Sequence, residues 1–330
     1  MLADGQQPTA RQRAWAEAAA ARARRRSAGT TAVAALGFRA AIRCESPELA
    51  RAVSATFADL AAPGRAADVV GAGHSHEIAV VTGRAGSTAL WADGVQVAGA
   101  LRPGLVLPTI SWLLNQGAIA HSPGLVLFHA ATLCSGEAGL LLPATSGSGK
   151  STLASALVAS GLSYLSDEVG ALDLHTGRVV AYPKPISLDD GSFAALATMP
   201  EPIPRAHVVD DASAPWTNLQ WQVPASSVRA GAVATSCRIA AVVFPARAPA
   251  GGRTAPLRPL GRAALCARLV EHSMTVLREP QAHFAACADL ARDVPGYELD
   301  VGDLTTACTV VHELLGSRSA TSTVGTTATR

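Results

Sequence analysis

The chain has 330 residues, of which 49% are hydrophobic and 16% are charged. A chain of this length and composition can bury enough apolar surface to fold as one large domain or two modest ones. The formal net charge of +2 gives no bulk electrostatic reason to expect nucleic acid as a partner. No apolar run is long enough to cross a bilayer and the N-terminus lacks the apolar core of a signal peptide, so we expect no membrane partner and a cytoplasmic location.

The six cysteines are scattered, with no C-x-x-C pair and no zinc-ligand spacing. We therefore expect buried free thiols in a reducing compartment. The basic residues are almost all Arg, and the two lysines are Lys150 and Lys184. In such a chain, a Lys at position 150 indicates chemistry that uses a compact ammonium group rather than a planar guanidinium.

The first part of the chain has the pattern of an arm followed by a small module. Residues 1–30 are expected to form a flexible or helical arm, and residues 31–105 a small α+β module. Ser46-Pro47 has the residue types of a helix start. Asp93-Gly94 lies between two strand-like segments and predicts a β-hairpin. A helix is expected over residues 109–120.

From about residue 124, continuous apolar runs alternate with helical patterns, which is typical of an α/β domain. We expect this domain to cover residues 106–315 and a disordered Ser-, Thr- and Gly-rich tail to cover 316–330. Residues 195–236 have no clear period and are expected to form loops around short elements. The expected strand segments are 125–128, 139–143, 162–174, 238–244 and 298–301, and the expected helices begin near 149 and cover 263–276, 282–291 and 304–315.

A glycine- and serine-rich loop joins the strand 139–143 to the helix that begins near residue 149. It has the sequence Ser146-Gly147-Ser148-Gly149-Lys150-Ser151-Thr152. Glycines let a backbone approach phosphate closely, and the N–H groups of the loop and of a helix N-terminus point at the anion. A P-loop of this kind binds a nucleoside triphosphate, with its Lys on the terminal phosphates and its Ser on magnesium. The first position of the pattern is Ala144 instead of Gly, which we expect the loop to tolerate.

Three further residues are candidates for chemistry. Asp167 and Glu168 lie near the end of the next strand segment. Adjacent acids there can divide the work, one holding magnesium and the other accepting a proton from an attacking hydroxyl. From spacing alone, a solvated turn is the alternative. His129 follows the strand 125–128, where a lone His is either structural or part of the site.

Together these motifs resemble the HPr kinase/phosphorylase superfamily. His129 lies 21 residues before Lys150, and Asp167 lies 17 residues after it. The firm resemblance covers about 125–190, and a weaker one extends to the end of the chain. The segments that carry it are Phe128-His129-Ala130-Ala131, Leu141 to Thr152, Leu165-Ser166-Asp167-Glu168 and Tyr182-Pro183-Lys184-Pro185-Ile186-Ser187-Leu188.

The resemblance implies an α/β fold with a P-loop kinase core, preceded here by the small N-terminal α+β module. It also implies an ATP-dependent kinase that acts on a hydroxyl, usually a serine of a protein or peptide. Asp167 would be the catalytic base, His129 would lie beside the reacting phosphate, and Ser151 and Glu168 would hold Mg²⁺. Lys150 would act in catalysis as well as in binding. The residues that would bind ATP are Ser146, Gly147, Ser148, Gly149, Lys150, Ser151 and Thr152.

The chain departs from authentic HPr kinases, which carry Asp-Asp where this chain has Asp167-Glu168 and which have a C-terminal signature segment that is not found here. It looks more like the HPr-kinase-related proteins found beside ribosomal peptide biosynthesis genes, such as those that modify lasso peptide precursors. The related enzymes are often oligomeric, which leaves a homo-oligomer possible. A kinase of small-molecule hydroxyls and a non-enzymatic nucleotide-binding module are the alternative functions that the sequence leaves open.

Overall fold

A computed structural model describes residues 18, 21, 22, 25–62, 76–82, 87–199, 203, 220–248 and 257–324, the last seven of these by their backbone alone. Most of the expected N-terminal arm lies outside the described residues, as do residues 200–202 and 204–219 of the 195–236 segment. The chain divides into two compact units. One comprises Met1–Ser122 with Arg205–Pro224, and the other comprises Pro123–Pro204 with Ala225–Arg330.

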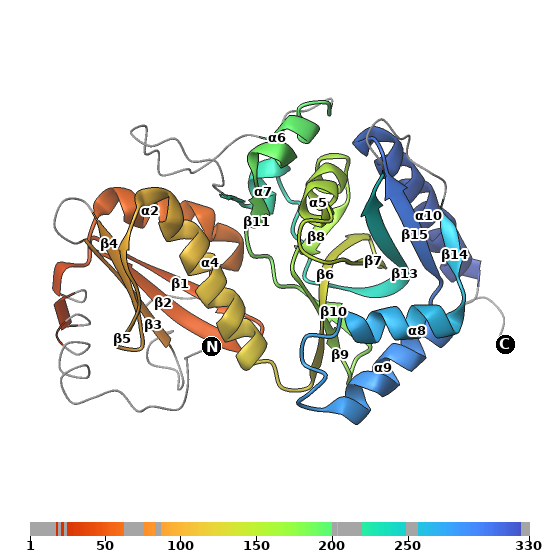
Figure 1. The fold of residues 1–330 in the computed structure, drawn as a ribbon, viewed down its shortest axis with the longest axis horizontal. Helices are drawn as coiled ribbons and strands as arrows, with labels where there is room; N and C mark the ends of the chain where they lie inside the picture. The colour runs from red at the N-terminus through yellow and green to blue at the C-terminus, as the bar shows by residue number, and fades with distance from the viewer. Residues whose placement is uncertain are drawn as a thin grey trace. The chain divides into compact units, whose positions relative to one another are not determined.

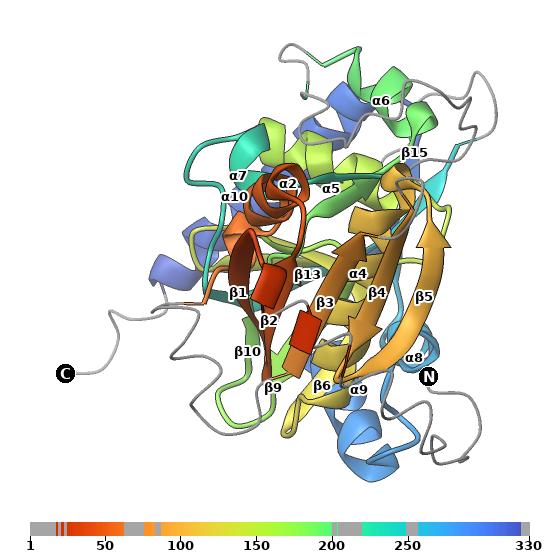
Figure 2. The same ribbon diagram turned by 90° about the vertical axis from the view of Figure 1, so that its left-hand side faces the viewer.

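The first unit is built on a five-stranded sheet in the order β1-β2-β3-β4-β5. Its strands β2 and β3 are parallel and the other neighbours are antiparallel, and Figure 2 shows them side by side. The expected hairpin turn is present, with positive φ angles at Asp93 and Gly94 between β4 and β5. The elements are β1(Gly29–Ala35), β2(Phe38–Cys44), α2(Pro47–Thr56), η1(Ala58–Leu60), β3(His76–Thr82), β4(Thr88–Ala92), β5(Val95–Leu101), α4(Pro103–Ala120) and β12(Trp221–Val223).

The helix α4 differs from the expectation that it would begin at residue 109. It begins at Pro103 and continues through Pro108. Pro103 occupies the first turn, where its missing N–H removes no helical hydrogen bond, and Pro108 removes only one. Val106 and Ile110 on this helix are fully buried, and α4 contacts β1, β2 and β4. The expected boundary at 105 and 106 therefore falls inside a helix, and the first unit ends at Ser122.

The second unit contains a ring of five strands. Strand β9 pairs with β10 and β6, β6 pairs with β7, β7 pairs with β13, and β13 pairs back with β10. Strand β8 adds to β6, and β15 and β14 extend the sheet beyond β13. The strands are β6(Leu125–Ser135), β7(Ala138–Pro143), β8(Ser163–Ser166), β9(Val169–Asp173), β10(Arg178–Val180), β11(Ile186–Leu188), β13(Ser236–Arg247), β14(Arg258–Leu260) and β15(Gly296–Val301).

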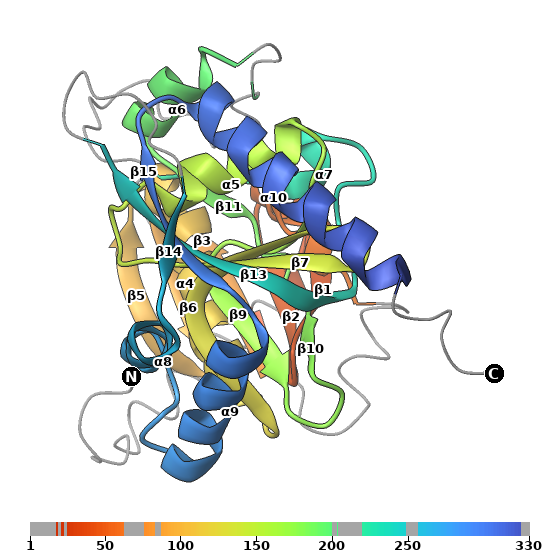
Figure 3. The ribbon, with the colours of Figure 1, turned by 90° about the vertical axis from the view of Figure 1, so that its right-hand side faces the viewer.

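Helices cover this sheet from two sides, as Figures 1 and 3 show. On one side, α8 and α9 pack Leu265, Leu269 and Cys287 into a core shared with Phe128 and Leu141. On the other side, α5 and α10 lie against each other, and α10 also contacts β7 and β13. The helices of this unit are α5(Lys150–Ala159), α6(Asp190–Leu196), α7(Ala225–Val228), α8(Arg262–Glu271), α9(Pro280–Asp293) and α10(Leu304–Val324).

The last helix is longer than expected. The sequence predicts an end at Leu315 and a disordered tail, whereas α10 continues to Val324. The extension contains no proline, and a glycine such as Gly316 costs a helix only about 1 kcal/mol. Residues 325–330 lie outside the described part of the chain.

All six cysteines are free thiols, as the sequence indicated. None of the helices in the described part of the chain combines the length and hydropathy that a bilayer span requires.

Candidate functional site

The glycine-rich loop connects β7 to α5, the strand-to-helix arrangement that the sequence predicted. Gly147 and Gly149 have φ angles of 79° and 89°, in the left-handed region that favours glycine. Gly149 is the N-cap of α5, and no side-chain hydrogen bond caps this end of the helix. The first N–H groups of α5 are therefore free of a side-chain cap at the positive end of the helix dipole, which favours an anion there.

Lys150 is a buried cation without a hydrogen-bonding partner. Its side chain lies in the first turn of α5, the residue is 6% exposed, and its Nζ has no partner among the described residues. The hydroxyl of Ser148 is also buried and unpartnered there. Burial lowers the pKa of Lys150 to about 8, against the opposing effect of Asp167 and Glu168. A buried ammonium without hydrogen bonds is unfavourable, so this position is suited to an anionic ligand rather than to packing.

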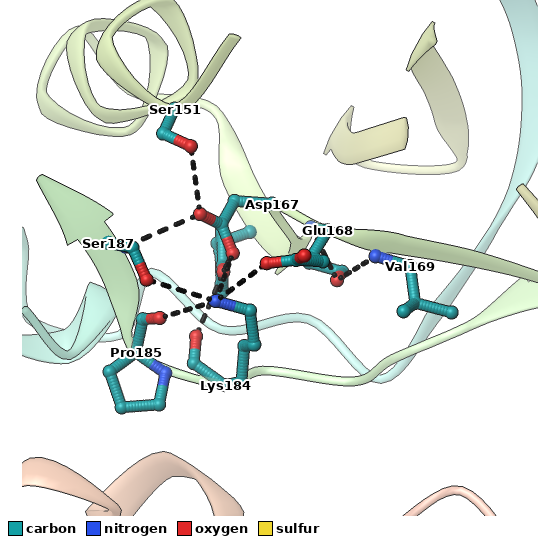
Figure 4. A network of polar contacts seen from close by, with 9 residues as sticks. Ser151, Asp167, Glu168, Val169, Lys184, Pro185 and Ser187 are labelled. Atoms are coloured by element: carbon teal, nitrogen blue, oxygen red, sulfur yellow. Dashed lines mark hydrogen bonds and ion pairs between the residues drawn. The ribbon is translucent and has the colours of Figure 1, made fainter. Parts of the chain in front are cut away.

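Asp167 lies in the turn between β8 and β9 and is 1% exposed. Its Oδ2 accepts from the Ser151 hydroxyl at 3.1 Å and from the Ser187 N–H at 3.4 Å. Its Oδ1 accepts from the Tyr164 hydroxyl at 3.1 Å and lies 3.1 Å from Lys184 Nζ. The solvated turn that spacing alone left open does not describe this residue, because its carboxylate is buried in a polar network next to α5 (Figure 4).

Lys184 is the second cation of this network, and the sequence reasoning did not select it as a site residue. It is 2% exposed, and its Nζ lies 3.1 Å from Asp167 Oδ1 and 3.3 Å from Glu168 Oε2. It also donates to the carbonyl of Pro185 at 3.1 Å (Figure 4). Burial opposes its charge, but the two carboxylates outweigh this and raise its pKa above the usual value. The rarity of lysine, which drew attention to Lys150, applies equally to Lys184 and was the signal that could have identified it.

Glu168 differs from Asp167 in its surroundings. Its side chain is 36% exposed, and its ion pair with Lys184 uses Oε2. In the described part of the chain, Oε1 accepts no hydrogen bond. Glu168 also affects the pKa values of Lys150, His129 and Tyr182 by its charge, which places it within electrostatic reach of the loop.

Two histidines lie within electrostatic reach of Lys150. His129 is in β6. Its backbone N–H donates to the backbone carbonyl of His272 at 2.8 Å, and its backbone carbonyl accepts from the Ala144 N–H at 3.4 Å. Burial and then the charge of Lys150 lower the pKa of His129. The same two causes, in the same order, lower the pKa of His272. Both imidazoles are therefore neutral at pH 7, and no sequence signal pointed to His272, which follows α8.

The remaining loop residues have less central positions. Ser146 is exposed. The hydroxyl of Thr152 donates to Ser192 Oγ in α6 at 2.9 Å, so this side chain ties two helices together. The structure thus brings Lys150, Ser151, the two acids and His129 into one site, while Ser146 and Thr152 lie at its edge.

No protein-family model matches this chain, and no curated protein matches it. Among solved structures, it is similar to the Hpr(Ser) kinase/phosphatase from Coxiella burnetii, with 13% sequence identity and a TM-score of 0.30. The match covers 57% of this chain and 94% of that chain. A likeness this distant assigns no role to any residue of this chain.

Proposed function

We propose that this protein is an ATP-dependent phosphotransferase that acts on a hydroxyl group, and that its acceptor is a serine of a peptide or protein. The observation that carries the proposal is the buried ammonium of Lys150, which has no hydrogen-bonding partner among the described residues and lies at the start of α5, where no side chain caps the helix. Helix N–H groups, two glycines in the left-handed region and a buried cation form a set of donors that matches a triphosphate. The Ser148 hydroxyl, also unpartnered, adds a donor on the same loop.

The polar groups beside the loop suit a magnesium ion bound with the nucleotide. The hydroxyl of Ser151 is a hard oxygen ligand of the kind that Mg²⁺ takes in nucleotide sites, and the neighbouring carboxylates of Asp167 and Glu168 supply negative charge that favours a cation. When bound, Mg²⁺ and ATP would supply an activated phosphoryl group whose charge is partly neutralised. The chain's own contribution would be to hold the phosphates at Lys150, to place an acid that accepts the hydroxyl proton, and to keep His129 neutral beside Lys150.

Binding and transfer can be tested separately. Titration of the full chain with ATP, with and without Mg²⁺, should give saturable binding that Lys150→Met abolishes, because this change removes the ammonium and keeps the side-chain length. Unchanged ATP affinity in Lys150→Met would remove the basis of the proposal.

Transfer is measured as a mass gain of one phosphate on a serine-containing peptide library incubated with ATP and Mg²⁺. Transfer to members of a metabolite panel, with no transfer to peptides, would instead identify a kinase of small molecules. Tight binding without transfer to any acceptor would identify a nucleotide-binding module.

A further inference from the structure

The two acids of the site are not equivalent, and the difference starts with how fully Asp167 is hydrogen-bonded. A carboxylate has about four lone-pair positions. Four donor groups lie within hydrogen-bonding distance of it, two on each oxygen: the hydroxyls of Tyr164 and Ser151, the Ser187 N–H and the Lys184 ammonium. The single proton of the Tyr164 hydroxyl is shared between Asp167 Oδ1 at 3.1 Å and the Lys184 carbonyl at 2.9 Å. A proton arriving at Asp167 would have to displace one of these donors. At 1% exposure, the carboxylate also leaves almost no surface that an acceptor hydroxyl could approach.

Glu168 has the opposite properties. Its side chain is 36% exposed, and Lys184 contacts Oε2 at 3.3 Å. Within the described residues, no donor occupies Oε1. A hydroxyl that enters from solvent can therefore reach this oxygen without breaking any contact that the site already has. Geometry and access are the first requirements for a general base, and of the two acids Glu168 meets both.

The contact between Asp167 and Ser151 has its own consequence. A serine hydroxyl has one proton to donate and two lone pairs that can accept or ligate. Ser151 gives its proton to Asp167 Oδ2 at 3.1 Å, which directs its lone pairs away from the carboxylate. A hydroxyl fixed in this way is oriented as an oxygen ligand for a cation beside the loop. Asp167 then acts through Ser151, in the manner of the partners that orient metal ligands.

Lys184 explains how two acids can be adjacent in a largely buried place. Its ammonium lies 3.1 Å from Asp167 and 3.3 Å from Glu168 (Figure 4). It holds Asp167 in place through Oδ1 and leaves Oδ2 to Ser151. Its ion pair with Glu168 is to Oε2. Oε1 accepts no hydrogen bond within the described residues, so it is the oxygen left for a proton.

We propose that Glu168 is the general base and that Asp167 is a positioning residue, which orients Ser151 toward magnesium. This rests on the proposed function, and it reverses the division that the sequence predicted, with Asp167 as the base and Glu168 on the metal. In the transfer step, the acceptor O–H gives its proton to Glu168 Oε1 as its oxygen forms a bond to the terminal phosphorus of ATP. The bond between that phosphorus and the bridging oxygen breaks, and ADP leaves with the electron pair.

The test uses Glu168→Gln and Asp167→Asn, a matched pair that replaces each carboxylate by an amide of the same size. ATP affinity is measured with and without Mg²⁺, and turnover is measured as ADP release with water or a serine peptide as the acceptor. Glu168→Gln should keep its affinity for ATP with Mg²⁺ within about twofold and lose about 10²- to 10⁴-fold in kcat, the usual contribution of a general base. Glu168→Asp, which retains a carboxylate, should recover part of this loss.

Asp167→Asn should instead lose about 10- to 100-fold of its affinity for ATP in the presence of Mg²⁺, the usual cost of removing the partner of a metal ligand. Its affinity for ATP without Mg²⁺ should stay near that of the wild type, which separates metal orientation from general damage to the fold. The opposite pattern, with metal-dependent affinity lost in Glu168→Gln and kcat alone lost in Asp167→Asn, would overturn the assignment and restore the division expected from the sequence.

Different results would contradict the roles assigned to Glu168 and Asp167 and the proposed function itself. If the wild-type protein does not bind ATP, the proposed function is wrong and the assignment falls with it. If the wild type binds ATP with Mg²⁺ but releases no ADP, the affinity measurements still decide. Metal-dependent affinity that falls in Asp167→Asn alone supports its positioning role, and a fall in Glu168→Gln alone refutes it.

Discussion

Lys150 and Lys184, the two lysines of the chain, give opposite predictions for the same substitution. Both ammonium groups are buried, but Lys184 is paired with two carboxylates and Lys150 has no hydrogen-bonding partner in the described part of the chain. Replacing Lys150 by Met keeps the aliphatic chain and removes a buried charge that has no hydrogen-bonding partner among the described residues. We expect Lys150→Met to stabilise the protein in the absence of ligand and Lys184→Met to destabilise it.

The magnitude for Lys150 follows from its pKa. Burial lowers the pKa from 10.5 to about 8. At a pH where Lys150 is charged, this shift corresponds to a destabilisation of the folded state by roughly 3 kcal/mol. The unfolded chain binds this proton more tightly than the folded one, so stability rises with pH between about 8 and 10.5. Lys150→Met should therefore be more stable than the wild type by up to roughly 3 kcal/mol at pH 7, and the difference should shrink as the pH rises through that window.

Lys184→Met is the control. It removes one of four donors from a buried carboxylate, and breaking a buried ion pair in this way costs about 3 to 5 kcal/mol. Urea unfolding of the two variants and the wild type at pH 7 and at pH 10 gives the comparison. Addition of ATP with Mg²⁺ at about 100 times the dissociation constant should stabilise the wild type by about 2.7 kcal/mol and Lys150→Met not at all.

Equal destabilisation by the two substitutions would refute this reasoning, because it would mean that Lys150 has a partner that stabilises the folded chain. Stabilisation of Lys150→Met by nucleotide to the wild-type extent would refute the role of its ammonium in binding.

Three further predictions follow from the same site and its sheet. Deprotonation of Lys150 should lower the affinity for ATP by about tenfold between pH 7 and pH 9. Titration calorimetry of the wild type can measure this, and an affinity that does not change over this range would contradict the prediction. The folded-state pKa values of His129 and His272 lie below 6.5, so the free energy of unfolding should fall as the pH drops below about 6.5. Replacing both histidines by Gln should make the free energy of unfolding depend less on pH in this acidic range. Gly139→Ala would place a Cβ 2.6 Å from Cys237 Sγ and 2.7 Å from the Arg238 carbonyl, and it should lower the thermal midpoint by the equivalent of about 1 to 3 kcal/mol. Gly316→Ala, which meets open space in α10, should raise the midpoint slightly and serves as its control.

Features with a short-range signal were predicted from the sequence. The hairpin at Asp93-Gly94 depends on two residues that adopt positive φ angles. The link between β7 and α5 depends on an apolar strand, a glycine-rich loop and a helical pattern that follow each other directly. In each case the residues that specify the feature are the residues that form it, so the local sequence is sufficient to predict it.

Features that depend on packing between distant segments were missed. Pro108 indicates a helix boundary locally, but burial of α4 side chains against the sheet of the first unit outweighs the one hydrogen bond that proline removes. His272 lies beside His129 because its carbonyl accepts from the His129 backbone N–H, a contact between segments far apart in the sequence. The pairing of β10 with β13, which closes the strand ring, is likewise invisible to a local pattern.

The different environments of the two lysines also determine how charge is distributed in the site. Asp167 and Glu168 both contact Lys184, and neither forms an ion pair with Lys150 within the 4 Å reach of such a contact in the described residues. The pKa of Lys184 is raised while the pKa of Lys150 is lowered, although both ammonium groups lie near the same two acids. One cation is thus neutralised by the protein and the other is left for a ligand.

A phosphate group bound at the start of α5 would raise the pKa of Lys150 again, so binding of ATP should take up a proton near pH 8 to 9. Calorimetric titrations in buffers of different ionisation enthalpy measure that proton directly, and an uptake of zero at this pH would show that the ligand does not reach Lys150.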